Sequence, residues 1–182
     1  AGVALLSVCR NRPRRTLPRF YADPAVWVAP FVMAHIHPRK LHPSNVLLGF
    51  PYGKDFIYDE MMVAGPRETG EATAKAIIAA NNKLGAQGGP KPGEGPSKEE
   101  RESGHYDLLF VGIASDGRQV KAAVTGDRDP GYGSTSRMIA ECAVCLRRDP
   151  PDVAGGFWTP GASVKDAVIK RLIDPAGLPF AV

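Results

Sequence analysis

Apolar side chains alternate with polar ones most clearly over residues 118–125, where Val or Ala occupies every second position. A second apolar run covers residues 106–113, and the dipeptide Asp116-Gly117 lies between the two runs. Asp-Gly favours a tight hairpin turn, and strict alternation gives a strand one buried and one wet face. The pattern therefore predicts an antiparallel hairpin.

Helical periodicity and helix-starting residues mark three longer segments. Residues 67–84 are rich in Ala, Lys and Glu, with apolar positions along one side. Asp129-Pro130 and Thr159-Pro160 each place a capping residue before a proline, which suits the first position of a helix. We expect helices over 67–84, from Pro130 to about 148 and from Pro160 through Leu172, and a short helix over 44–49.

Three more apolar segments have the length and composition of strands. They cover residues 27–37, 55–64 and 178–182, and Pro30 indicates an edge position or a bulge in the first. Strands are mixed with helices rather than alternating strictly with them. The fold class that we predict is α+β, with a mixed, largely antiparallel sheet and helices packed on one face.

Positive charge is concentrated at the start of the chain. Residues 1–50 hold seven Lys or Arg and one acidic residue, whereas the whole chain has a net charge of +4. We predict a basic N-terminal arm over residues 1–22 and one domain over residues 23–182. We interpret the arm as a solvated terminus; the alternative is a tether to phosphates or anionic lipid. No aromatic side chain is interleaved in the arginine run, so nucleic acid is not an expected partner.

The cysteines indicate a reducing compartment. Cys9, Cys142 and Cys145 are too few and too unevenly placed for a disulfide framework, so the sequence predicts a cytoplasmic protein. The apolar stretch over residues 1–9 is shorter than the roughly 20 residues that cross a bilayer, and no transmembrane segment is expected.

Histidine and cysteine residues raise the question of a zinc site. His35 and His37 share one face of a predicted strand, and Cys142 and Cys145 share a helix face. The two cysteines lie inside an apolar helical run, where buried core residues explain them better than metal ligands or a nucleophile. We therefore assign no metal ligand and no catalytic residue.

Glycine-rich segments give no nucleotide site. Residues 85–97 contain many glycines, but three prolines remove backbone donors and no Gly-Lys-Ser or Gly-Lys-Thr opens a helix. The motif Gly-x-Gly-x-x-Gly, typical of dinucleotide binding, does not occur in the 182 residues. We expect a surface connection at 85–97 and no cofactor bound by this chain alone.

Two groups of polar side chains are candidates for binding a substrate. Ser44, Asn45 and Tyr52 offer an amide and hydroxyls that can orient a polar ligand; capping of the short helix is the alternative role of the first two. Tyr132 and Thr135 lie where a helix begins, so backbone N–H groups there could receive an anion. The alternative is an ordinary helix entry. Phe157 and Trp158 are interpreted as a packing anchor.

An ordered set of short motifs extends over about residues 24–182. It resembles the C-terminal substrate domain of saccharopine dehydrogenase-like oxidoreductases, a group that includes the trans-acting enoyl reductases. The motifs are Pro30-Phe31-Val32-Met33-Ala34, Ser44-Asn45-Val46-Leu47-Leu48-Gly49, Tyr52-Gly53-Lys54-Asp55-Phe56, residues 90–96, Asp116-Gly117-Arg118, residues 126–132, Met138 and Gly155-Gly156-Phe157-Trp158-Thr159-Pro160.

The resemblance implies a hydride-transfer oxidoreductase that uses NAD(P). Similar proteins pair an N-terminal Rossmann domain with an α+β domain of this kind, and the active site lies between them. On this resemblance the chain is a partial enzyme that needs a Rossmann-type partner, with a homodimer also possible. The alternative is a non-catalytic protein-interaction domain derived from the same family.

Overall fold

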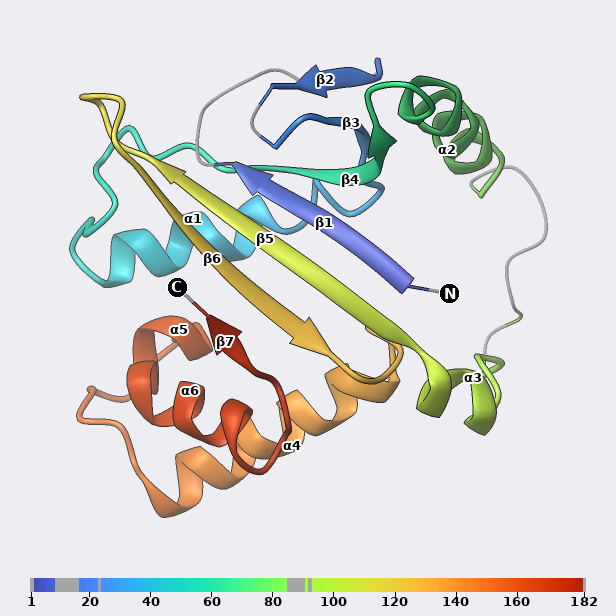
Figure 1. Cartoon of the computed structure of the whole chain (residues 1–182). Helices are drawn as coiled ribbons and strands as arrows, with labels where there is room; N and C mark the ends of the chain where they lie inside the picture. The colour runs from blue at the N-terminus through green and yellow to red at the C-terminus, as the bar shows by residue number, and fades with distance from the viewer. Residues whose placement is uncertain (1, 9–16, 23, 85–90, 92, 182) are drawn as a thin grey trace.

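A single sheet organises the chain (Figure 1). The computed structural model describes residues 2–8, 17–22, 24–84, 91 and 93–181. The strands are β1 (Gly2–Val8), β2 (Arg19–Tyr21), β3 (Val26–Pro30), β4 (Asp59–Pro66), β5 (His105–Ile113), β6 (Gln119–Gly126) and β7 (Phe180–Ala181). The helices are α1 (Pro38–Leu47), α2 (Gly70–Leu84), α3 (Lys98–Ser103), α4 (Gly133–Arg148), α5 (Pro160–Ser163) and α6 (Lys165–Ile173).

The seven strands are ordered β2-β3-β4-β1-β5-β6-β7. Only β1 and β5 run parallel; the other neighbouring pairs are antiparallel. The expected α+β class and the mixed, largely antiparallel sheet are therefore confirmed. Helix α2 lies against the β3–β4 end of the sheet, and α4 to α6 lie at the β5–β7 end (Figure 1).

The two faces of the sheet carry separate apolar clusters. On one face Val28, Met61 and Val111 are buried together. On the other face Tyr106 packs with Leu178 and with side chains of α4 and α6. Because neighbouring residues in a strand point to opposite faces, β5 contributes odd-numbered side chains to the first cluster and even-numbered ones to the second.

Helix α6 and Val164, which precedes it, bury their apolar side against α4. Val164, Val168 and Cys145 form a buried cluster, and Leu172 bridges it to the cluster around Tyr106. The side chains of Val164, Val168 and Leu172, which recur every four residues, are thus covered by other parts of the chain. A partner is not needed to cover this helix.

The N-terminal segment differs from the predicted arm. Residues 2–8 pair with both β4 and β5, and residues 19–21 pair with β3, so both segments belong to the sheet. The arginines at 10, 12, 14 and 15 lie outside the described residues, as does Cys9. A tether role for them stays a prediction.

Several element boundaries were predicted wrongly. The strand expected over 27–37 ends at Pro30, and a bulge at Trp27/Val28 accompanies it. The helix expected over 44–49 begins at Pro38 and tolerates Pro43 inside it. Helix α4 begins at Gly133 rather than Pro130. Helix α3 was missed, although Ser97 and Glu100 form a capping box that the sequence displays.

Gly126 lets β6, β5 and α4 meet closely. The Tyr106 hydroxyl lies 2.8 Å from the Ser134 hydroxyl in a buried contact that joins β5 to the first turn of α4. A Cβ at Gly126 would overlap the Tyr106 ring. Only glycine leaves room for the ring in this position.

Substitution G126A should therefore destabilise the protein by about 1–3 kcal/mol, because the Tyr106 ring and its hydrogen bond must shift. Urea unfolding followed by circular dichroism measures this. Gly161 is the matched control, since an added Cβ there meets nothing within 4 Å. Equal stability of G126A and wild type would contradict the tight contact.

Candidate functional site

Asn45 holds the loop that follows α1. Its side chain is buried; the amide nitrogen donates to the Gly53 carbonyl at 2.8 Å, and the amide oxygen accepts from the Tyr52 backbone N–H at 3.1 Å. The Asn45 carbonyl also accepts the Phe50 N–H at 2.7 Å. One residue therefore fixes the turn from both its backbone and its side chain.

The turn needs that support because its backbone is strained. Gly49, Phe50 and Gly53 all have positive φ angles, at 80°, 65° and 89°. The left-handed region costs a non-glycine residue free energy, so Phe50 adopts it only where surrounding contacts compensate. The bonds to Asn45 are those contacts.

Tyr52 projects from this loop. Its side chain is 61% exposed, and its ring centroid lies 5.1 Å from that of Phe56. The His42 ring lies edge-on to the Phe56 ring, with 5.8 Å between the two ring centroids. The Tyr52 side chain is therefore placed by aromatic contacts and faces solvent.

Ser44 links α1 to the start of α5. Its hydroxyl lies 2.7 Å from the Thr159 hydroxyl and 2.9 Å from the Lys40 carbonyl. Thr159 precedes Pro160, where a helix was expected to begin and to run through Leu172; that helix is divided at Val164 into α5 and α6, and the Thr159 side chain makes no cap bond. Two motifs that are 115 residues apart in sequence thus meet in one place.

The structure brings Ser44, Asn45 and Tyr52 together around the end of α1. Asn45 is occupied by contacts within the loop, whereas Ser44 contacts Thr159 and Tyr52 is exposed. Ser44 and Asn45 do not cap α1, which starts at Pro38. Substrate binding by the three residues stays a prediction.

The backbone N–H groups at the start of α4 are engaged by Asp129. Its carboxylate accepts from Gly131, Tyr132 and Gly133 at 3.2, 2.6 and 2.9 Å. Partial burial raises the pKa of Asp129, but these bonds outweigh burial and hold the pKa below its usual value. A ligand anion would have to displace this carboxylate.

Tyr132 and Thr135 lie at the start of α4. Helices α4 and α1 are separate elements, and the start of α4 lies apart from the end of α1 (Figure 1). The Tyr132 side chain is exposed, and the Thr135 hydroxyl donates to the Pro130 carbonyl at 2.7 Å. The five predicted residues therefore form two groups rather than one site. Anion binding by the second group stays a prediction.

A histidine–glutamate pair was missed by the sequence reasoning. His37 immediately precedes α1, and its Nδ1 lies 2.7 and 2.9 Å from the two carboxylate oxygens of Glu60 on β4. The Glu60 side chain is 4% exposed and that of His37 is 42% exposed. The sequence offered one signal of a buried acid: Glu60 directly precedes the apolar residues of β4.

The pair has the chemistry of a proton donor and acceptor. Burial raises the pKa of Glu60, while the hydrogen bond and charge of His37 lower it in part. Because Nδ1 of His37 contacts the Glu60 carboxylate, Nε2 is the ring nitrogen that is left for a further partner. Such an arrangement is typical of acid–base groups.

Phe157 was interpreted wrongly as part of a packing anchor, because its side chain is fully exposed. The Trp158 indole donates to the Ala154 carbonyl at 2.8 Å and is about a third exposed. Cys145 is buried in the core, as expected, and Cys142 is partly buried.

Within the described part of the chain, no cluster of three or more His, Cys, Asp or Glu residues is arranged to hold a metal ion. In the same part of the chain, every helix is too short or too polar to cross a membrane.

Replacing Asn45 with Ala should lower the free energy of unfolding by about 2 kcal/mol, because a buried donor and acceptor of the 49–53 turn lose their partners. Urea unfolding measures the change. The neighbouring S44A variant is the control; it removes a partly buried hydroxyl and should cost less than about 1 kcal/mol. Equal costs would contradict the role of Asn45.

Carbon-detected NMR titration of the Glu60 carboxyl should show a pKa above the ordinary 4.5. Since the folded protein then binds the proton more tightly than the unfolded chain, Glu60 makes the free energy of unfolding fall as pH rises from 4.5 through that pKa. Substitution H37Q should raise the pKa further, whereas H35Q should leave it unchanged. A Glu60 pKa at or below 4.5 would contradict its burial.

Most of the chain is similar in sequence to one group of known proteins. A Mycobacterium tuberculosis protein whose name includes the words trans-acting enoyl reductase is 33% identical over 179 aligned residues, which cover 89% of this chain and 42% of that protein. A Mycobacterium bovis protein named trans-acting enoyl reductase is 31% identical, again over 89% of this chain and 42% of that protein. One from Mycobacterium ulcerans is 31% identical over 80% of this chain and 39% of its own length.

No protein-family model matches the chain. No solved structure matches it either. The chain spans about two fifths of the length of the curated relatives that it matches. Over 89% of its own length, the chain is homologous to part of proteins named trans-acting enoyl reductases.

Proposed function

We propose that this chain supplies the substrate-side part of an NAD(P)-linked oxidoreductase of the saccharopine dehydrogenase-like kind, which reduces an enoyl group. The observation that carries the proposal is the 31–33% identity to trans-acting enoyl reductases over 89% of the chain. The motifs of the resemblance extend over the same part of the sequence. An α+β domain built around a mixed sheet is compatible with it.

The dinucleotide would be held by a second unit. The sequence contains no Gly-x-Gly-x-x-Gly, and the N–H groups at the start of α4 donate to Asp129. The N–H groups at the start of α4 are therefore not free to receive a pyrophosphate. A Rossmann-type partner would complete the site.

Within the chain, the His37–Glu60 pair is the best-placed acid–base group. The buried carboxylate fixes one ring nitrogen of His37, and the imidazole is partly exposed. An imidazole held in place by a carboxylate can exchange a proton with a bound substrate. Tyr52 and Ser44 would orient polar parts of the substrate near the other end of α1.

A non-catalytic interaction domain is the second candidate. The observation that favours it is a set of exposed apolar side chains before, within and after α1 and at the start of α5. The Ser44–Thr159 contact joins these segments. Such side chains are typical of a surface that a partner covers. They are Val32, Met33, Ile36, Val46, Leu47, Tyr52 and Phe157.

A chimera tests the proposal. The segment of the Mycobacterium tuberculosis relative that matches this chain is replaced by this chain, so that the remainder of the relative is present. We expect the chimera to bind NADPH and to oxidise it when a trans-2-enoyl thioester is added. Calorimetry with NADPH and absorbance at the nicotinamide band measure binding and turnover.

The isolated chain is the control and should bind neither NADPH nor NADH. A chimera that folds and binds NADPH but reduces no enoyl thioester would contradict the proposal. In that case, a dimer of the isolated chain in light scattering would favour the interaction domain.

A further inference from the structure

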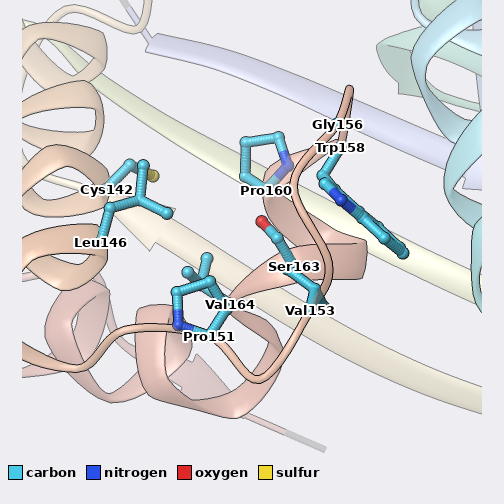
Figure 2. A pocket seen from close by; sticks show the side chains of 9 residues that line it. All are labelled: Cys142, Leu146, Pro151, Val153, Gly156, Trp158, Pro160, Ser163 and Val164. Atoms are coloured by element: carbon cyan, nitrogen blue, oxygen red, sulfur yellow. The ribbon is translucent and has the colours of Figure 1, made fainter.

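An apolar pocket of about 240 Å³ opens between α4, α5 and the loop that connects α4 to α5 (Figure 2). Cys142 and Leu146 line it from α4, and Pro160, Ser163 and Val164 line it from α5 and its C-terminal end. The loop over residues 151–158 supplies the remaining wall. None of the residues predicted from sequence to bind a ligand lines this pocket.

The lining carries no charged side chain. Its polar groups are already satisfied: the Ser163 hydroxyl donates to the Thr159 carbonyl at 3.1 Å, and the Trp158 indole donates to the Ala154 carbonyl at 2.8 Å. Burial raises the pKa of the Cys142 thiol, which therefore stays neutral at neutral pH. The pocket suits an uncharged, apolar group.

The walls of the pocket are anchored. Val164 belongs to the buried cluster with Cys145 and Val168, and Cys142 packs against that cluster. At the start of the connecting loop, Asp149 accepts a bond from Arg171 at 2.9 Å, and Arg171 also reaches Glu141 at 3.2 Å. A pocket fixed in this way loses little free energy to ordering when a ligand enters.

The size restricts the ligand. A volume of about 240 Å³ is below the roughly 300–1,000 Å³ of sites that enclose a drug-sized molecule. A dinucleotide therefore exceeds it, whereas a short hydrocarbon segment fits. Leu146 lines the pocket and is half-exposed, so the pocket is open to solvent on that side.

We propose that this pocket receives the hydrocarbon end of an acyl ligand. The choice of an acyl chain rests on the proposed enoyl substrate, and the pocket's neutral, apolar lining and small volume support it independently. Binding involves burial of methylene groups and no covalent step. The carbonyl end of the ligand lies outside the pocket.

Calorimetric titration of the whole chain with a series of trans-2-enoic acids, from four to twelve carbons, tests the proposal. The affinity should increase about fourfold for each added methylene until the pocket is full, and then level off. Methyl NMR signals of Leu146 and Val164 should shift in the same titrations. Affinity that does not depend on chain length, or shifts elsewhere only, would overturn the proposal.

A pair of variants on α4 localises the binding. Substitution L146D puts a charge at the pocket and should weaken binding of the best acid at least tenfold. Substitution I139D puts the same charge on an exposed residue of the same helix that does not line the pocket, and should leave binding unchanged. Circular dichroism checks that both variants fold; equal loss in both would overturn the assignment.

The result is separable from the proposed function. Chain-length-dependent binding without turnover in the chimera would refute the enoyl reductase proposal and support the pocket. Turnover in the chimera together with binding that ignores chain length would refute the pocket and leave the enzyme proposal standing.

Discussion

The pairing of β1 with β5 is the interaction on which the rest of the sheet depends. β1 lies between β4 and β5, and its pairing with β5 is the sole parallel contact among neighbouring strands of the described residues. Without that pairing, the strands divide into a β2–β3–β4–β1 group and a β5–β6–β7 group. Each group is then a separate antiparallel sheet, and three strands are about the minimum for independent stability.

The two groups carry different parts of the candidate chemistry. Glu60 on β4 meets His37, whereas β5 supports α4 and α6, which in turn support the apolar pocket. The strand register places the Glu60 side chain and the cluster around Tyr106 on the same face of the sheet. Glu60 and Phe110 both lie opposite Ser7 of β1, and Phe110, four residues after Tyr106 in β5, points to the same face as Tyr106. The expectation of helices on one face is met for α1, α4 and α6.

The contact between Ser44 and Thr159 connects these parts. It joins α1, which begins next to the histidine–glutamate pair, to α5, which lines the pocket. The acid–base group that the described residues provide lies about 10 Å along α1 from Ser44, at a rise of about 1.5 Å per residue.

The sequence by itself determined the elements whose causes are local. Alternation and the Asp116-Gly117 turn predicted the β5–β6 hairpin, where Gly117 has a φ of 87°, and periodicity predicted α2 and α4. Asp129 accepts bonds from N–H groups two to four residues away, although α4 begins at Gly133 rather than at Pro130, where Asp129 was expected to cap it.

Only the tertiary structure decided the contacts between distant segments. The place of β1 in the middle of the sheet depends on β5, about 100 residues later, so a short apolar run beside arginines gave no sign of it. The His37–Glu60 pair spans 23 residues and Ser44–Thr159 spans 115. Asn45 looked like a cap or a ligand group, but its role depends on a left-handed turn that no local propensity would favour at Phe50. Local rules act over a few residues, whereas burial and partner geometry are set by the whole fold.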